Sequence, residues 1–230
     1  LIYIFNRNFI FDKLKILGWI FKKILCCLRK EVWKFIDDIH EFSSLPPADI
    51  PEIVFWGRSN VGKSSLINSL TQSSIAKTSK TPGRTRSLVF FQLEKKLRIV
   101  DFPGYGFSKI SKKIENKLDS LIDQYLQKRK CIEKLFLLID SNLGFKDTDK
   151  IIINQLDVIL KDKVIIVFTK KDRIKNNSDK EKLKFYNDVA YSKFKKKFFN
   201  TSIKDTNDII LLKKFMMRPL VQKNEIIKSK

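Results

Sequence analysis

Glycine, cysteine and histidine are scarce in this sequence, which has 7 Gly, 3 Cys and 1 His among 230 residues. Two of the three cysteines, Cys26 and Cys27, are adjacent and are poor disulfide partners. The odd count therefore argues against a disulfide framework and indicates a reducing compartment. With only His40 and no clustered thiols, a zinc site is not expected. Where glycine is this rare, each one should stand where the backbone needs it.

A long uninterrupted hydrophobic run is also missing. Residues 1–30 are apolar, but Lys13, Lys15, Lys22 and Lys23 interrupt every candidate span. No run reaches the ~18 apolar residues that a transmembrane helix needs. No small-residue cleavage site follows, which argues against a secretory signal. A basic amphipathic helix in peripheral contact with an anionic membrane, or an organellar transit peptide, stays open for this segment.

Positive charge is in large excess, with 47 Lys and Arg against 25 Asp and Glu and a net charge of +22. Such an excess concerns partners rather than fold, and it suits a polyanion such as RNA or an anionic membrane surface. A biased base composition of the gene would also enrich lysine. Hydrophobic residues make up 43% of the chain, enough for one globular core.

Short apolar runs alternate with longer helical patterns after a Pro-rich break at 45–51. Strands are predicted at 53–56, 88–93, 97–100, 135–139, 164–168 and 197–199, and helices at 62–70, 112–130, 147–160, 179–194 and 208–217. This alternation predicts an α/β fold of three layers, with helices on both faces of a sheet. Its six-stranded sheet would be mostly parallel, with one antiparallel edge strand. We divide the chain into a basic apolar extension (1–34), a main α/β domain (35–220) and a basic tail (221–230).

A phosphate-binding loop follows the first predicted strand. The segment fits the pattern G-x-x-x-x-G-K-[ST] and leads into a predicted helix, which is the context that this motif requires. Backbone N–H groups of such a loop point at phosphate oxygens, and the helix N-terminus adds partial positive charge. Lys63 should contact the β- and γ-phosphates, and the Ser64 hydroxyl should hold Mg²⁺. The loop consists of Gly57, Arg58, Ser59, Asn60, Val61, Gly62, Lys63 and Ser64.

Asp101 ends a later apolar strand and is followed by Phe102, Pro103 and Gly104. A carboxylate in this place would hold Mg²⁺ directly or through water. The N–H of Gly104 would contact the γ-phosphate and so sense hydrolysis. Between the two motifs lies a polar loop in which a Thr hydroxyl should complete the Mg²⁺ shell, and Thr81 and Thr85 are the candidates.

A guanine-reading motif, Thr169-Lys170-Lys171-Asp172, follows the apolar run 164–168. The Asp172 carboxylate can accept hydrogen bonds from both the N1–H and the exocyclic amine of guanine. Adenine lacks this pair of donors, so Asp172 favours GTP over ATP. The stem of Lys170 can lie over the base. A last loop, Asn200-Thr201-Ser202, offers a backbone N–H to the guanine carbonyl. An ATP-dependent enzyme with a coincidental Asp172 is the alternative.

The ordered segments GRSNVGKSSLIN, TSKTPGRTRS, DFPGYGFS, TKKD and TS resemble the EngB (YihA/YsxC) family of bacterial GTPases, within the TrmE–Era group. The resemblance covers about residues 35–220. It implies a P-loop NTPase fold of the Ras-like type with GTPase activity, a role in assembly of the large (50S) ribosomal subunit, and a requirement in cell division and septation. We expect a cytoplasmic monomer that contacts the large ribosomal subunit and ribosomal RNA. It adds Gly83, Arg84, Thr85, Arg86 and Ser87 to the nucleotide contacts and favours Thr85 over Thr81 as the Mg²⁺ ligand.

Three positions depart from that family. The segment after the fourth predicted strand reads Asp140-Ser141-Asn142-Leu143-Gly144 rather than D-x-R-x-G, and Asn200 replaces a usual Phe. Trp56 stands where a small residue usually precedes the P-loop glycine, which questions the packing there. None of these changes removes a phosphate or metal contact.

Hydrolysis should be slow without a partner, because Tyr105 occupies the place where Ras-like enzymes have a Gln that orients water. We expect Lys63, Thr85 and Gly104 to act on the transferred phosphate. Mg²⁺ would be the cofactor, held by Ser64, Thr85 and Asp101. This chain resembles related GTPases that use K⁺ in having an Asn in the P-loop, here Asn60, so K⁺ is a candidate second cation. A GTP/GDP switch in ribosome assembly is the leading hypothesis, and a membrane-surface GTPase using residues 1–30 is the alternative.

Overall fold

A computed structural model of the chain describes residues 31–77, 87–106 and 112–218. The chain divides into two compact units, Leu1–Val32 and Trp33–Lys230, and nearly all described residues belong to the second. This second unit contains one seven-stranded sheet with the order β1-β3-β4-β2-β5-β6-β7. The strands are β1 (Trp33–Ile39), β2 (Glu52–Gly57), β3 (Leu88–Leu93), β4 (Leu97–Asp101), β5 (Ile132–Asp140), β6 (Val164–Thr169) and β7 (Lys197–Asn200).

The predicted fold class is confirmed, but the predicted number of six strands is wrong. The additional strand is β1, which pairs antiparallel with β3 at the edge of the sheet. Since β3 also pairs antiparallel with β4, this edge has two antiparallel ladders instead of one. Strands β4, β2, β5, β6 and β7 are parallel. The carboxyl ends of these five strands therefore lie at the same end of the sheet. The loops that carry the sequence motifs, here called the motif loops, begin at this end.

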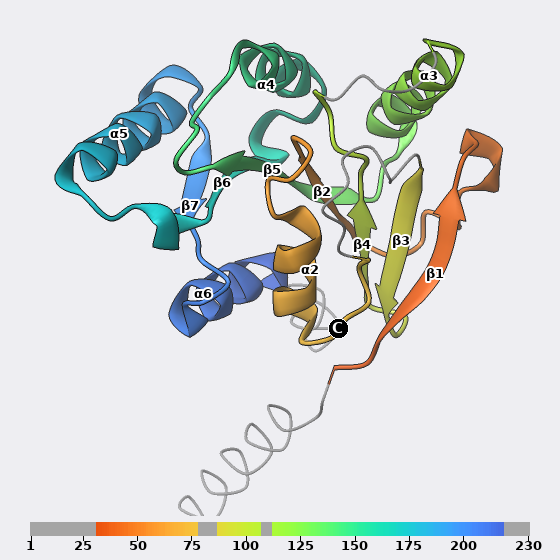
Figure 1. Cartoon of the computed structure of the whole chain (residues 1–230). Coiled ribbons are helices and arrows are strands. Elements are labelled where there is room, and N and C mark those ends of the chain that lie inside the picture. Colours follow the sequence, from red (N-terminus) through yellow and green to blue (C-terminus); the bar gives the residue numbers. More distant parts are fainter. Residues whose placement is uncertain (1–30, 78–86, 107–111, 219–230) are drawn as a thin grey trace, which may run out of the picture. The chain divides into compact units, whose positions relative to one another are not determined.

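Helices cover both faces of the sheet (Figure 1). On one face lie α2 and α6, and on the other lie α3, α4 and α5. The α-helices are α2 (Lys63–Thr71), α3 (Lys112–Lys128), α4 (Asp147–Leu160), α5 (Asn177–Asp188) and α6 (Thr206–Met216). The predicted helix 179–194 differs at its end, where the chain continues as a π-helical turn, η4 (Val189–Lys193).

Two hydrophobic clusters hold these layers together. Along β2, Ile53 and Phe55 pack with the α2 and α6 side, whereas Val54 and Trp56 pack with the α3 and α4 side. All of β2 is buried. Alternation of side chains along a strand covered on both faces explains why its sequence is apolar throughout. Among the helices of the described residues, none combines the length and the apolar character required to cross a bilayer.

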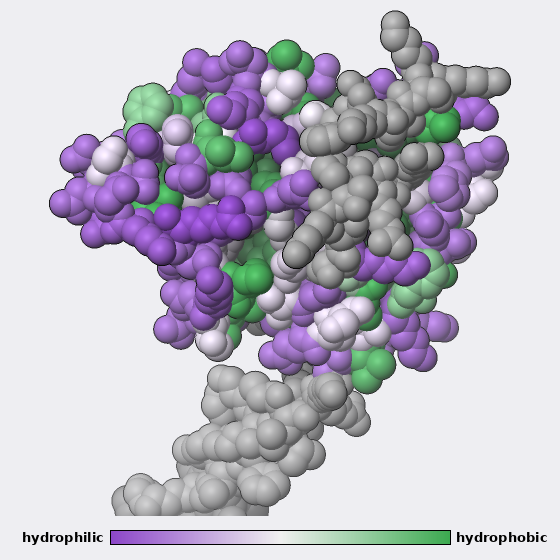
Figure 2. Space-filling view, viewed as in Figure 1, coloured by the Kyte–Doolittle hydropathy of each residue, from purple (hydrophilic) through white to green (hydrophobic). Residues whose placement is uncertain are grey.

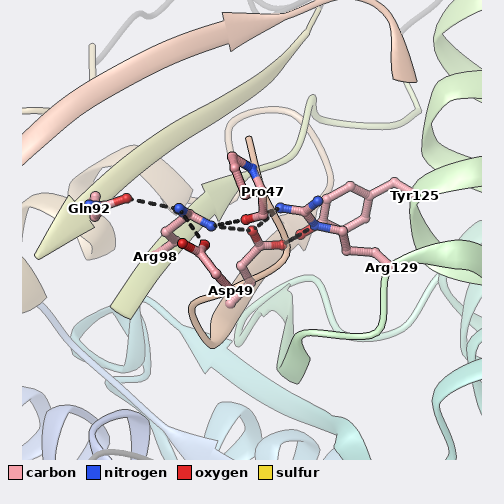
Figure 3. A network of polar contacts seen from close by, with 7 residues as sticks. Pro47, Asp49, Gln92, Arg98, Tyr125 and Arg129 are labelled. Carbon is pink, nitrogen blue, oxygen red and sulfur yellow. Dashed lines mark hydrogen bonds and ion pairs between the residues drawn. The ribbon is translucent and has the colours of Figure 1, made fainter. Parts of the chain in front are cut away.

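A buried polar network fixes the Pro-rich segment that leads into β2 (Figure 3). Glu52, which is 0% exposed, accepts hydrogen bonds from Arg129 Nη2 at 2.6 Å and from the Tyr125 hydroxyl at 2.6 Å. Arg98 Nη1 lies 3.5 Å from Glu52 Oε1 and donates to the carbonyl oxygen of Pro47 at 2.5 Å. One carboxylate thus joins β4, α3 and the Pro-rich segment at the end of the sheet opposite the motif loops.

Candidate nucleotide-binding site

The P-loop conformation depends on two glycines. Gly62 has φ 100°, a left-handed conformation that suits glycine, and it caps the N-terminus of α2. At Gly57 a Cβ atom would lie 2.8 Å from the carbonyl oxygen of Leu138 in β5, so a side chain there would displace the strand. The loop between them therefore curls tightly enough to place its N–H groups at the start of α2.

Lys63 and Asp101 form a buried ion pair between the P-loop and the end of β4. Their side chains are 9% and 6% exposed. Burial raises the pKa of Asp101, and the charge and hydrogen bond of Lys63 partly oppose this rise. The structure thus brings together the predicted phosphate-binding lysine and the predicted metal carboxylate.

The donors at this point fit Mg²⁺. Ser64, the second residue of α2, is half-buried and makes no side-chain hydrogen bond to a described residue. Asp101 and Ser64 offer hard oxygen ligands, and no group of three His, Cys, Asp or Glu side chains among the described residues forms a separate metal site. Mg²⁺ commonly uses one or two protein carboxylates together with substrate phosphates and water, so this small set suits it.

The segment after Asp101 runs beside the P-loop, and backbone hydrogen bonds join the two. Ser59 N–H donates to the Tyr105 carbonyl at 3.2 Å, and Tyr105 N–H donates to the Gly57 carbonyl at 3.3 Å. A Cβ at Gly104 would lie 2.9 Å from Ser59 Oγ. Gly104 is therefore held against the P-loop.

Trp56 fits the site without a packing defect. Its side chain is 8% exposed, and its Nε1 donates to the Pro103 carbonyl at 3.1 Å. Its ring meets Phe102 and Tyr105 edge to face, at centroid distances of 5.6 and 5.4 Å. The large side chain thus links β2 to the segment that follows Asp101, and the concern raised from the sequence does not apply.

Lys170 and Thr169 tie the guanine-reading loop to the P-loop. Thr169 Oγ1 donates to the Val61 carbonyl at 2.7 Å, and Lys170 Nζ donates to the Asn60 carbonyl at 2.7 Å. Lys170 also pairs with Asp140 at 2.7 Å. Asp140, at the end of β5, was noted in the sequence only as the start of the segment 140–144 and was not assigned to the site, because an Asp after a strand is common and only this contact distinguishes it.

Asp172 is fixed by the last loop. Its two carboxylate oxygens accept from Ser202 Oγ and from Lys204 Nζ, both at 2.9 Å. The hydrogen bond from Lys204 is the main cause that lowers the pKa of Asp172, which keeps the carboxylate ionised. Lys204 and Asp208, whose carboxylate accepts from the Ser202 N–H, are further residues that the sequence motifs did not reveal.

The predicted site residues fall into three groups. The first group follows the carboxyl ends of parallel strands of the sheet and comprises the P-loop after β2, the segment 101–104 after β4, the segment 169–172 after β6 and the last loop after β7. Ser87 is buried just before β3. Gly83, Arg84, Thr85 and Arg86, together with the alternative Thr81, lie outside the described residues.

Comparisons with known proteins agree with this geometry. A family model described as "50S ribosome-binding GTPase" matches residues 52–170. The probable GTP-binding protein EngB of Metamycoplasma arthritidis is 45% identical over 155 residues, which cover 66% of this chain and 82% of that protein. The corresponding EngB of Rickettsia bellii is 41% identical over 162 residues, 69% of this chain and 76% of that protein.

Solved structures place the fold in the same group. A crystal structure of a probable GTP-binding protein EngB aligns with TM-score 0.56 and 27% identity, covering 75% of this chain and 99% of that one. An Era variant of Aquifex aeolicus bound to GDP and aluminium fluoride, at 23% identity and TM-score 0.60, covers 73% of this chain and 56% of its own and shares the fold. The chain therefore belongs to the EngB family of GTP-binding proteins and is a GTPase.

Proposed function

We propose that this GTPase is a slow, Mg²⁺-dependent switch that acts in assembly of the large (50S) ribosomal subunit. The observation that carries the nucleotide part is the ion pair of Lys63 with Asp101 after the neighbouring strands β2 and β4, with Asp172 following β6 at the same end of the sheet. We assign nucleotide contacts to the predicted residues of the P-loop, 83–87, 101–104, 169–172 and 200–202. Lys63 would bind phosphate, and Ser64, Thr85 and Asp101 would hold Mg²⁺, which neutralises developing phosphate charge when bound.

Slow intrinsic hydrolysis follows from the position of Tyr105. The Tyr105 hydroxyl donates a hydrogen bond to Asp149 of α4 at 2.8 Å. It is therefore not available to orient the attacking water, as the Gln of Ras-like enzymes does. A partner that supplies orientation or positive charge would accelerate the reaction. The switch itself would be the ordering of Thr85 and Gly104 around the γ-phosphate and their release on hydrolysis.

The ribosomal part rests on family membership, on the description of the matched family model and on the net charge of +22. A positive surface favours RNA phosphates. In Figure 2, hydrophilic residues cover most of the described surface on the face drawn, and the hydrophobic areas between them are small. We propose that the protein acts in the cytoplasm as a monomer. We also propose that it is needed for normal cell division and septation, as the family resemblance implies.

Nucleotide binding to the wild type and to Asp172→Asn tests the base reader, with GTP, ATP and xanthosine triphosphate as ligands. Xanthine has a carbonyl where guanine has an amine, so an Asn can pair with it where an Asp cannot. We expect the wild type to prefer GTP and the variant to prefer xanthosine triphosphate. Equal binding of ATP and GTP by the wild type would contradict the assignment of Asp172. Co-sedimentation with large ribosomal subunits in the GTP and GDP states tests the partner.

K⁺ is the second candidate cation. Asn60 has φ 62° in the P-loop, and its carbonyl is held by Lys170. If K⁺ binds beside the phosphates, hydrolysis should accelerate when K⁺ replaces Na⁺ at constant ionic strength, and Asn60→Ala should lose most of that difference. An equal rate in both salts would exclude the idea. The alternative peripheral contact with anionic membrane depends on residues 1–30, which lie outside the described residues.

A further inference from the structure

Three cationic side chains from three different elements surround one aromatic ring, Phe215 of α6. Lys134 Nζ of β5 lies 5.2 Å from the ring centroid, and Lys197 Nζ of β7 lies 4.7 Å from it. Arg218, just beyond α6, has its guanidinium carbon 5.3 Å from the same centroid. The topology makes this cluster, since Lys134 and Lys197 stand near the amino ends of β5 and β7. We call these three cations the Phe215 cluster.

The ring is a fixed platform. Phe215 is half-buried and packs against Phe199 and Phe136, with centroid distances of 5.0 and 6.3 Å. An aromatic face attracts a nearby cation through the negative charge density of the ring. One ring does not neutralise three charges, so the Phe215 cluster keeps a net positive field.

The three charges also repel one another. Each lies about 5 Å from one centroid, so any two are within about 10 Å, roughly one Debye length at 0.1 M salt. Within the described residues, none of the three makes an ion pair with a carboxylate. Burial lowers the pKa of Lys134, Glu133 opposes this, and Arg218 lowers it further. An anion bound among the three cations would reduce this repulsion, which is present in the protein without a bound anion.

The cluster lies away from the nucleotide. Lys134 stands six residues before Asp140, the end of β5, and at ~3.3 Å a residue this is roughly 20 Å along the strand. A partner bound at the cluster would therefore leave the loops at the carboxyl ends free to bind GTP. Lys195, exposed before β7, extends the positive surface on that side.

We propose that the Phe215 cluster is a binding site for the phosphate backbone of RNA, at the amino end of the sheet and separate from the GTP site. It deepens the proposed function, because it rests on ribosomal RNA being the partner. Closely spaced cations on separate elements suit a chain of phosphates, since counterion release rewards each neutralised phosphate. The contact should be independent of base sequence.

The test compares the full chain with the triple variant Lys134→Gln/Lys197→Gln/Arg218→Gln. A matched control, Lys95→Gln/Lys180→Gln/Lys184→Gln, removes the same charge from exposed lysines elsewhere. Binding is measured to purified large-subunit ribosomal RNA and to large subunits at several salt concentrations. The cluster variant should bind RNA at least tenfold more weakly at 0.1 M salt, with the salt slope reduced by about 2. The control should change the slope by less than about 1, and nucleotide binding should be unchanged in both variants.

Each outcome decides between the two proposals. Equal RNA affinity and slope in the cluster variant and the control would overturn the site. Binding to vesicles of phosphatidylserine and phosphatidylcholine is measured as well. If the cluster variant loses binding to these vesicles but keeps its RNA affinity, the RNA site is overturned in favour of a membrane-binding surface. If the wild type binds RNA through the cluster but never binds large subunits, the proposed ribosomal function fails while the RNA site stands.

Discussion

Asp149 is a buried carboxylate that joins two loops of the nucleotide site to α4. Its side chain is 0% exposed, and Arg58 Nε of the P-loop lies 3.4 Å from its Oδ1. The same oxygen accepts from the Tyr105 hydroxyl at 2.8 Å, and Oδ2 accepts from the Lys146 N–H at 2.7 Å. Burial and Asp149 both raise the pKa of Tyr105, so its hydroxyl stays protonated as a donor. Asp149 therefore acts as a positioning residue for both loops.

We expect Asp149→Asn to lower kcat for GTP hydrolysis about tenfold, equal to about 1.4 kcal/mol, with KM changed less than twofold. The reason is that Arg58 and Tyr105 lose their shared ionic partner, and small displacements near transferred phosphate slow the reaction more than they weaken binding. Steady-state kinetics at a temperature where the variant is folded measures the effect. Tyr105→Phe, which removes only the hydroxyl, should act in the same direction.

Asp147→Asn is the matched control, because Asp147 lies two residues away on α4, is 92% exposed and pairs with Lys150. It should leave kcat and KM unchanged. If Asp149→Asn lowered the melting temperature while kcat stayed at the wild-type value, Asp149 would have a structural role only.

Sequence spacing identifies some candidate residues of the site and misses others. Gly57, Lys63 and Asp172 are recognisable from sequence because each belongs to a short motif with a required order. Asp149 and Lys204 are not recognisable in this way. Asp149 pairs with a residue 91 positions away in the chain and Lys204 with one 32 positions away, and only the folded sheet brings these partners together. No local pattern distinguishes these charges from the many solvated ones in so basic a sequence.

Among the elements, the Pro-rich segment, β4 and α3 share the carboxylate of Glu52. Arg129 donates to both of its oxygens, at 2.6 and 2.9 Å. Glu52→Gln would leave two guanidinium groups facing a neutral amide in a buried place. We expect a loss of about 3 kcal/mol in the free energy of unfolding, as when one partner of a buried ion pair is removed. Urea unfolding of the nucleotide-free protein measures it.

Asp49 provides the control for Glu52, since it pairs with Arg98 of the same network at 3.0 Å but is 61% exposed. Asp49→Asn should barely change the unfolding midpoint, because water replaces an exposed partner. Equal effects of the two substitutions would contradict the view that burial makes Glu52 the important member.

The elements that the sequence failed to predict also have physical explanations. Strand β1 was assigned in part to the extension 1–34 because its burial is confined to Trp33 and Ile39, and five exposed residues lie between. A register shift between Phe35 and Asp37 breaks the alternation that would indicate a strand. By contrast, helix α4 was predicted with its observed bounds, because its apolar residues recur at helical spacing.

For the whole molecule, the switch proposal requires that GTP and GDP stabilise the chain to different degrees. A ligand bound only by the native state stabilises it by about 2.7 kcal/mol at 100 times its Kd. Under the proposed site both nucleotides would contact the P-loop and Asp172, so both should raise the melting temperature. The γ-phosphate would add the contacts of Thr85 and Gly104, so a non-hydrolysable GTP analogue with Mg²⁺ should raise it further.

Thr85→Ala should remove this difference between the two nucleotides while leaving the stabilisation by GDP intact, because a Thr hydroxyl that completes the Mg²⁺ shell acts only in the GTP state. Thr81→Ala is the matched control from the same loop and should keep the difference. Thermal unfolding at saturating nucleotide, with and without Mg²⁺, separates the cases. Loss of the difference in Thr81→Ala alone would transfer the metal role to Thr81. Equal stabilisation of the wild type by both nucleotides would mean that the γ-phosphate does not order this loop, and hydrolysis would then give a ribosomal partner no conformational change to detect.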